Sequence, residues 1–181
     1  MIEQWITRIK EKVHDNGFFS VEKVTKTSDR GRESTFHLIG SPDWVVIIPL
    51  NQQEEVMVIQ QFRHGSSSVS LEFPAGRVEM GEVPTEAAKR ELAEETGLST
   101  QNIVYLGAFN PNPAMFSNMC HVFTANQLVK TDKTDFDEFE SVETLYLTVN
   151  QIQEKIQSGE IIHGLMVASF LYYLNKEQCE R

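Results

Sequence analysis

The sequence predicts an α/β fold in which a mixed β-sheet lies between layers of helices. Short apolar segments bounded by turn residues recur along the chain, which is the pattern of β-strands. Residues 84–96 instead have the composition and end signals of a helix, and predicted strands lie on both sides of it in the sequence. A last predicted helix, residues 163–174, is apolar enough to pack on the body of the protein. Helices in the middle and at the end of a strand-rich chain fit a sheet that is covered on both faces.

The composition is that of a soluble globular protein. Its 181 residues are 40% hydrophobic and 23% charged, which suits one domain with a core and a small addition. No apolar run reaches the roughly 18 residues of a membrane span, and residues 1–13 lack the uninterrupted apolar core of a signal peptide. Cys120 and Cys179 form no CxxC motif, which favours free thiols in a reducing cytoplasm. The net charge of −10, with no basic stripe, argues against nucleic acid as a partner.

The first 41 residues are predicted to form an extension made of a helix and a β-hairpin. Residues 1–15 are predicted as an amphipathic packing or dimerisation helix because apolar residues recur there at helical spacing: Ile2, Trp5, Ile6, Ile9 and Val13. Strands are predicted over residues 19–27 and 32–39, on either side of a Ser-Asp-Arg-Gly turn. We expect the main domain to cover residues 42–181.

The main domain is predicted to contain most of the strands. Residues 44–50 form a continuous apolar run of the kind that is buried on both faces of a sheet. The other strands are predicted at residues 56–62, 69–73, 103–109, 120–125 and 144–149. A further short helix is predicted over residues 151–157. Residues 128–140 are polar and acidic and are predicted as a loop.

Residues 76–98 are the most informative segment of the chain. A glycine-rich loop leads to Pro84, which suits the first position of a helix, and Gly97 is a natural helix end. At about 100° per residue, the carboxylates of Glu91, Glu94 and Glu95 fall within roughly a 100° sector of this helix. Like charges at this spacing repel one another, so the cluster gains nothing by itself. It becomes favourable around a hard cation, for which Mg²⁺ is the usual choice with oxygen ligands.

The full spacing of this segment is G-x5-E-x7-R-E-L-x-E-E-x-G-L, from Gly76 to Leu98. It resembles the Nudix box at every defined position, and the resemblance to the family extends over roughly residues 42–150. The resemblance implies an α/β/α sandwich with a mixed sheet, to which the N-terminal residues are an addition. It also implies hydrolysis of a nucleoside diphosphate linked to another group.

The resemblance implies a metal site built on the helix. Glu91 and Glu95 are the expected direct ligands, and Glu94 is either a third ligand or reaches the metal through water. In the family the backbone carbonyl before the box glycine also binds metal, and here it belongs to Ala75. The expected cofactor is Mg²⁺, with Mn²⁺ as a substitute. Arg90 either contacts phosphate or orients the glutamates.

The general base is left open by the resemblance. Some Nudix enzymes use a glutamate of the box, for which Glu94 is the candidate. Those that resemble ADP-ribose pyrophosphatases use a glutamate of a late loop, for which Glu138 and Glu140 are the candidates. The position of Glu140 just before a predicted strand favours it over Glu138.

Sequence outside the box narrows the substrate class. The QFR and EFPAG segments resemble the pattern of ADP-ribose and nucleoside-diphosphate-sugar pyrophosphatases, in which Arg63 would hold a phosphate and Glu72 would contact substrate or support the metal loop. Pro113 lies near the position of a proline that marks ADP-ribose hydrolases. An N-terminal β-rich extension is typical of that group, where it forms a homodimer and contributes to the nucleotide pocket. Asn118 stands where that group has a glutamate, which leaves room for other sugars.

The sequence therefore predicts a Mg²⁺-dependent hydrolase of nucleoside diphosphate sugars, of the ADP-ribose, ADP-sugar and GDP-mannose class. Its products would be a nucleoside monophosphate and a sugar phosphate. Two alternatives are a Nudix hydrolase of dinucleoside polyphosphates or nucleoside triphosphates, and a non-catalytic nucleotide sensor. The QFR and EFPAG segments argue against the first, and the complete box glutamates argue against the second.

Overall fold

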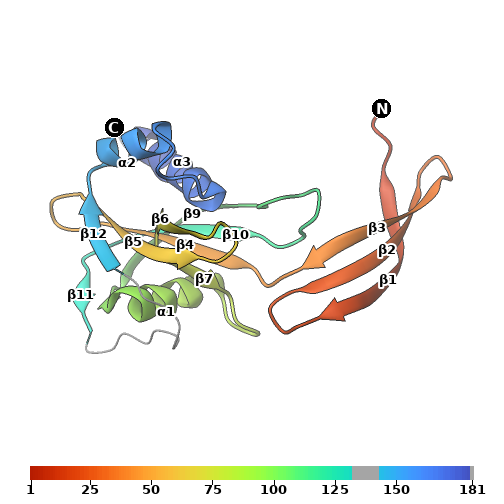
Figure 1. The fold of residues 1–181 in the computed structure, drawn as a ribbon, viewed down its shortest axis with the longest axis horizontal. Helices are drawn as coiled ribbons and strands as arrows, with labels where there is room; N and C mark the ends of the chain where they lie inside the picture. The colour runs from red at the N-terminus through yellow and green to blue at the C-terminus, as the bar shows by residue number, and fades with distance from the viewer. Residues whose placement is uncertain (132–142, 180–181) are drawn as a thin grey trace. The chain divides into compact units, whose positions relative to one another are not determined.

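A computed structural model describes residues 1–131 and 143–179 of the chain (Figure 1). The chain forms two compact units. Unit 1 comprises Met1–Pro42 and Asn110–Met119, and unit 2 comprises Asp43–Phe109 and Cys120–Arg181. No helix in the described residues is long and apolar enough to cross a membrane.

Unit 1 is built on a three-stranded antiparallel sheet with the order β1-β2-β3. Its strands are β1 (Trp5–Asp15), β2 (Ser20–Ser28) and β3 (Glu33–Gly40). The two strands of the predicted hairpin are confirmed as β2 and β3, with the turn between them.

The predicted N-terminal helix is wrong, because residues 5–15 form strand β1. β1 pairs with β2 from Trp5↔Ser28 to Asp15↔Ser20, with register shifts between Thr7 and Ile9 and between Lys12 and His14. Each bulge inserts one extra residue and breaks the two-residue alternation of a strand. Ile6 and Ile9 therefore share a face of the sheet although they lie three residues apart, which imitates helical spacing in the sequence.

The loop between residues 110 and 119 belongs to unit 1 through hydrogen bonds. The Ile39 N–H donates to the carbonyl of Met115 at 2.8 Å. The side-chain amide of Asn118 donates to the carbonyl of Pro42 at 2.9 Å, and Asn118 itself is 3% exposed. The loop asparagines thus hold the loop itself and its contact with the end of the sheet.

Unit 2 contains a four-stranded sheet with the order β7-β4-β10-β9 and a three-stranded sheet with the order β12-β5-β6. The strands of the first are β4 (Trp44–Pro49), β7 (Ala75–Arg77), β9 (Asn102–Phe109) and β10 (Cys120–Asn126). Those of the second are β5 (Val56–Arg63), β6 (Ser68–Glu72) and β12 (Glu143–Leu147). A two-stranded ladder joins β8 (Leu98–Ser99) to β11 (Val129–Lys130). Because β4 and β10 are parallel and the other pairs are antiparallel, the sheet is mixed, as predicted.

Helices cover both faces of this layer (Figure 1). Helix α1 (Pro84–Thr96) buries Ala87, Ala88 and Leu92 against one face. Helices α2 (Val149–Gln157) and α3 (Gly164–Cys179) pack on the other face. The alternation along β4 explains both cores: Val45 and Ile47 belong to the α1 side, and Val46 and Ile48 to the opposite side. The predicted α/β sandwich with an N-terminal β-sheet is therefore confirmed.

Candidate active site

Helix α1 begins and ends where its sequence signals predict. Val83 is extended and precedes Pro84 at the helix start. Gly97 takes a left-handed conformation with φ 67°, which a residue with a side chain adopts rarely, and its N–H donates to the carbonyl of Ala93. These ends fix which turn of the helix carries the box carboxylates.

Arg90 is the centre of the carboxylate cluster on α1. Its Nε and Nη2 donate to the two carboxylate oxygens of Glu82 at 3.1 and 3.0 Å. Its Nη1 donates to Glu91 at 2.8 Å and to Glu94 at 2.9 Å, and Nη2 also donates to the carbonyl of Arg77 at 2.8 Å. These bonds match the five N–H groups that a guanidinium carries, so Arg90 orients the glutamates and has no donor left over for a phosphate.

The charges of this cluster depend on one another. Hydrogen bonds to Glu82 raise the pKa of Arg90 more than burial lowers it. The same hydrogen bonds lower the pKa of Glu82. Glu82 therefore serves as the fixed anion that holds Arg90.

Glu91 lies against the backbone of Gly76 on β7. A Cβ atom placed on Gly76 would lie 2.0 to 2.2 Å from the carboxylate atoms of Glu91, so only a glycine leaves room for that carboxylate. Burial raises the pKa of Glu91 above its ordinary value, and the hydrogen bond and charge of Arg90 offset only part of this. A partly buried carboxylate of this kind is stabilised by a cation placed next to it.

Glu95 connects the end of α1 to the start of β7. Its Oε2 accepts the backbone N–H of Ala75 at 2.9 Å, and the residue is 9% exposed. Ala75, whose carbonyl is predicted to bind the metal, is therefore held by Glu95, which is predicted to bind the same metal.

The donor groups around α1 fit Mg²⁺ in their chemistry. Glu91, Glu94, Glu95 and the carbonyl of Ala75 offer only oxygen atoms, which this ion prefers. Across residues 1–131 and 143–179, no three acidic, histidine or cysteine side chains converge into a formed metal site. The hydrogen bonds explain this arrangement, because Glu91 and Glu94 accept from Arg90 while Glu95 accepts from Ala75.

Arg63 and Glu72 form a partly buried ion pair on the neighbouring strands β5 and β6. Nε and Nη2 of Arg63 donate to the two oxygens of Glu72 at 2.9 and 2.6 Å. The side chain of Glu72 is fully buried, whereas that of Arg63 is 38% exposed. Burial alone would raise the pKa of Glu72, but hydrogen bonds from Arg63 and Ser70 and the charge of Arg63 lower it below its ordinary value. Glu72 stays ionised and fixes the guanidinium of Arg63.

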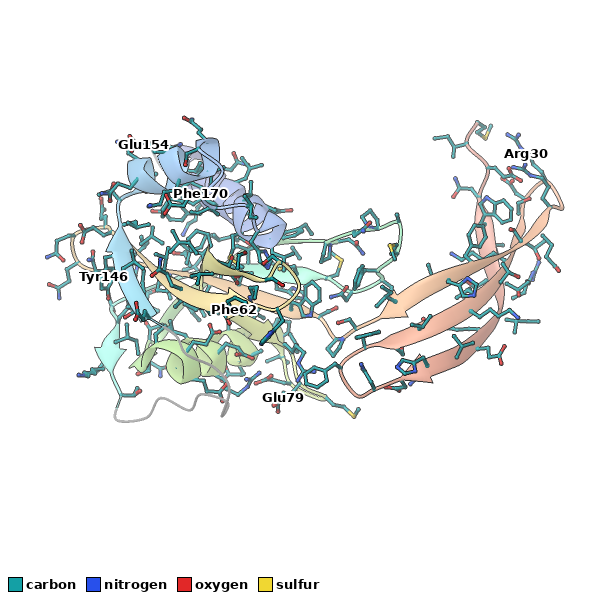
Figure 2. The ribbon with its side chains drawn as sticks, viewed as in Figure 1. Arg30, Phe62, Glu79, Tyr146, Glu154 and Phe170 are labelled. Atoms are coloured by element: carbon teal, nitrogen blue, oxygen red, sulfur yellow. The ribbon has the colours of Figure 1, made fainter. Side chains whose placement is uncertain are left out.

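The spacing of the QFR segment follows from its strand. Gln61 is buried and Phe62, which is labelled in Figure 2, is 52% exposed, because successive side chains of a strand point to opposite faces. Arg63 therefore shares a face with Gln61, and the intervening position does not contribute to the ion pair.

The structure brings together only some of the predicted site residues. Pro113 lies in the 110–119 loop of unit 1. Glu138 and Glu140 lie outside the described residues. The pairing of Arg63 with Glu72 was not predicted, although two opposite charges in neighbouring strands are a signal that could have indicated it.

Comparison with known proteins identifies the family. The family model described as "NUDIX domain" matches residues 41–169, so the chain belongs to the Nudix family. It is 30% identical over 148 residues to an ADP-ribose pyrophosphatase of Bacillus subtilis, covering 81% of this chain and 80% of that protein. It is 33% identical over 126 residues to an ADP-sugar pyrophosphatase of Mus musculus, covering 64% and 58%. A crystal structure of an ADP compounds hydrolase has the same fold, with a TM-score of 0.86 at 21% identity over 98% of this chain and 96% of that one.

The chain is therefore a Nudix pyrophosphatase, an enzyme that acts on diphosphate bonds of small nucleotide molecules. The family resemblance predicted from the box is confirmed.

Proposed function

We propose that this Nudix pyrophosphatase hydrolyses nucleoside diphosphate sugars of the ADP-ribose, ADP-sugar and GDP-mannose class in a Mg²⁺-dependent reaction. The products are a nucleoside monophosphate and a sugar phosphate. The observation that carries the proposal is the ion pair of Arg63 with Glu72, which joins the QFR and EFPAG segments. In this pair Glu72 orients the partly exposed guanidinium of Arg63 on β5. The neighbouring strand β6 leads into the box.

Each residue then has a defined task in the proposed reaction. Glu91, Glu95, Glu94 and the Ala75 carbonyl would hold Mg²⁺, which when bound supplies positive charge against the diphosphate oxygens. Arg90 keeps the glutamates oriented through its five hydrogen bonds.

Substrate contact in this scheme comes from outside the box. Arg63 binds a phosphate oxygen of the substrate, and Glu72 keeps the guanidinium in place. Arg90 does not contact the phosphate in this scheme, because its N–H groups all donate to protein oxygens.

A substrate panel tests the proposed class. We expect the highest kcat/KM among ADP-ribose, ADP-glucose, GDP-mannose and UDP-glucose, and lower values for diadenosine polyphosphates and deoxynucleoside triphosphates. A preference for the last two groups would instead support the alternative Nudix activities. Absence of turnover for every diphosphate compound, with nucleotide binding retained, would support a sensor.

We propose Glu140 as the general base, with Glu138 and the box residue Glu94 as the alternatives. The family resemblance favours a base from segment 132–142, and the described residues on either side of this segment are anchored in unit 2. On one side the Thr131 N–H donates to the Gly97 carbonyl at 2.7 Å, at the end of α1. On the other side Glu143 pairs with Gln60 on β5.

Glu140→Gln is expected to lower kcat by about a thousandfold and to leave metal affinity unchanged, because removing a general base typically costs a factor of about 10² to 10⁴. Steady-state kinetics and metal titration of the same preparation measure the two effects. Glu138→Gln is the matched variant two residues away. A large loss of kcat in Glu138→Gln with little loss in Glu140→Gln would show that the base is Glu138.

We also propose that unit 1 forms a homodimer. Its sheet exposes several large apolar side chains, including Ile6 at 59% and Ile9 at 63%, which share one face of β1. Exposed apolar groups that lie together commonly mark a protein interface. The predicted contribution of this unit to the nucleotide pocket remains a prediction.

Ile9→Glu is expected to convert the dimer into a monomer, because it places a charge on the apolar face of β1. Light scattering after gel filtration should give twice the chain mass of 20.7 kDa for the wild type and a single chain mass for the variant. Gln52→Glu is the control for an added negative charge, since Gln52 is an exposed polar residue of unit 2. A wild type that elutes as a monomer at all concentrations would contradict the proposal.

A further inference from the structure

The four residues from Glu72 to Ala75 connect the three-stranded sheet of unit 2 to its four-stranded sheet, because β6 ends at Glu72 and β7 begins at Ala75. Each of the four is held by a different element of secondary structure. The partners are Arg63 of β5 for the Glu72 carboxylate, Met166 of α3 for the Phe73 N–H, Ile47 of β4 for the Pro74 carbonyl, and Glu95 of α1 for the Ala75 N–H. The position of this segment therefore depends on four separate anchors.

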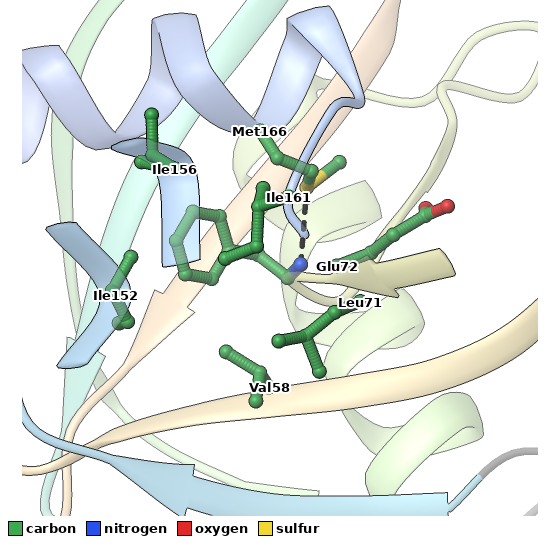
Figure 3. Close-up of a pocket in the computed structure, with 8 residues that line it drawn as sticks. Val58, Leu71, Glu72, Ile152, Ile156, Ile161 and Met166 are labelled. Atoms are coloured by element: carbon green, nitrogen blue, oxygen red, sulfur yellow. Dashed lines mark hydrogen bonds between the residues drawn. The ribbon is translucent and has the colours of Figure 1, made fainter. Parts of the chain in front are cut away.

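The anchor from α3 is a thioether. The Phe73 N–H donates to the Sδ atom of Met166 at 3.0 Å, and each of the two residues is only 2% exposed (Figure 3). A thioether is a weak acceptor, yet a buried backbone N–H needs a partner. Leucine or isoleucine would fill a similar volume without offering any acceptor. The sulfur atom is thus the feature of this side chain that the N–H uses.

Water cannot take the place of the sulfur. Apart from Glu72, the space beside it is lined by apolar side chains, among them Val58, Leu71, Ile152 and Ile161 (Figure 3). It has no room for a water molecule. If Met166 offered no acceptor, the Phe73 N–H would remain buried without a partner, or the segment would shift until it found one.

The first turn of α3 fixes the backbone of the residue that carries the sulfur. The ring Nδ1 of His163 accepts the N–H of Leu165 at 3.2 Å, and the carbonyl of His163 accepts the N–H of Met166 at 3.0 Å. Met166 is therefore fixed at the start of a helix of 16 residues that packs on the sheet.

We propose that Met166 is a positioning residue for the metal site, acting through the Phe73 N–H on the segment that carries Glu72 and Ala75. α3 contributes no predicted metal ligand. The hydrogen bond of Met166 links this helix to the backbone segment that presents the Ala75 carbonyl and carries Glu72, which pairs with Arg63. The metal part of this inference rests on the proposed function, whereas the hydrogen bond does not.

Met166→Leu tests the proposal, because it keeps the approximate volume and removes the acceptor. In the metal-free protein, we expect amide hydrogen exchange at Phe73 to become about tenfold faster or more. Because outer partners of metal ligands typically change affinity by about 10- to 100-fold, we expect the Kd for Mn²⁺, measured by electron paramagnetic resonance, to rise about tenfold. Ile152→Val is the matched control, since it removes one methyl group from the lining of the same space and removes no hydrogen-bond acceptor.

The outcomes distinguish the hydrogen bond to Phe73 from its effect on the metal site. Equal Phe73 exchange in Met166→Leu and Ile152→Val, compared at the same stability, would overturn the proposal. Faster exchange at Phe73 with an unchanged Mn²⁺ Kd would overturn the positioning role. If Met166→Leu does not fold, the wild type still decides, because a Phe73 amide that exchanges as fast as an exposed loop amide contradicts the anchor. None of these readouts uses a substrate, so failure of the proposed activity would leave them intact.

Discussion

Glu95→Gln is expected to lower kcat for ADP-ribose by about a thousandfold while the fold is retained. The neutral side chain has the same length, and its amide oxygen can still accept the N–H of Ala75 that Glu95 accepts at 2.9 Å. What it loses is the charge that would hold the metal. A metal ion typically supplies several kcal/mol of transition-state stabilisation, and about 4 kcal/mol corresponds to about a thousandfold in rate.

Steady-state kinetics at saturating Mg²⁺ and thermal unfolding in a chelator measure the two parts of this prediction. Glu86→Gln is the matched control, because Glu86 lies in the first turn of the same helix and its side chain pairs with Lys89 at the surface. It removes an equal charge from α1 and should leave kcat unchanged. Full activity of Glu95→Gln would contradict the assignment of this carboxylate to the metal.

Gly76→Ala is expected to lower activity at least a hundredfold with a smaller effect on stability. The added Cβ would meet the carboxylate of Glu91 at 2.0 to 2.2 Å, so the carboxylate has to move. Moving it breaks the 2.8 Å hydrogen bond from Arg90 and displaces a predicted ligand. Disturbing the residues that orient metal ligands typically costs a factor of about 10 to 100, and here a ligand itself is displaced.

Gly65→Ala is the control for this second prediction, because a Cβ at Gly65 meets nothing within 4 Å. Its activity should equal that of the wild type. Metal titration should show a weakened site in Gly76→Ala and an unchanged site in Gly65→Ala. Wild-type activity in Gly76→Ala would show that Glu91 does not need its position against β7.

The sequence predicts the parts of this molecule that depend on local signals. Proline at the start and glycine at the end of α1 define that helix, and its carboxylate spacing defines the cluster. The apolar run of β4 gives a strand buried on both faces. In each case neighbouring residues in the sequence carry the physical cause.

The parts that the sequence does not predict depend on contacts between distant residues. The sequence predicts a helix in place of β1 because two bulges interrupt the alternation of its apolar residues. These bulges depend on the pairing of β1 with β2. The use of every donor of Arg90 requires Arg77 and Glu82 to be close in space. The sulfur of Met166 reaches Phe73 across 93 residues, and no local pattern marks it.

The central claim is Mg²⁺-dependent hydrolysis of the diphosphate bond of a nucleoside diphosphate sugar. Hydrolysis of ADP-ribose in water enriched in ¹⁸O, with Mg²⁺ and with a chelator, tests it most directly. With Mg²⁺ we expect AMP and ribose 5-phosphate in equal amounts, with one ¹⁸O atom in one of the two phosphate groups, because water attacks one phosphorus and the diphosphate bond breaks. With the chelator we expect neither product. Products without ¹⁸O, release of inorganic phosphate instead of the two monophosphates, or turnover that is unaffected by the chelator would contradict it.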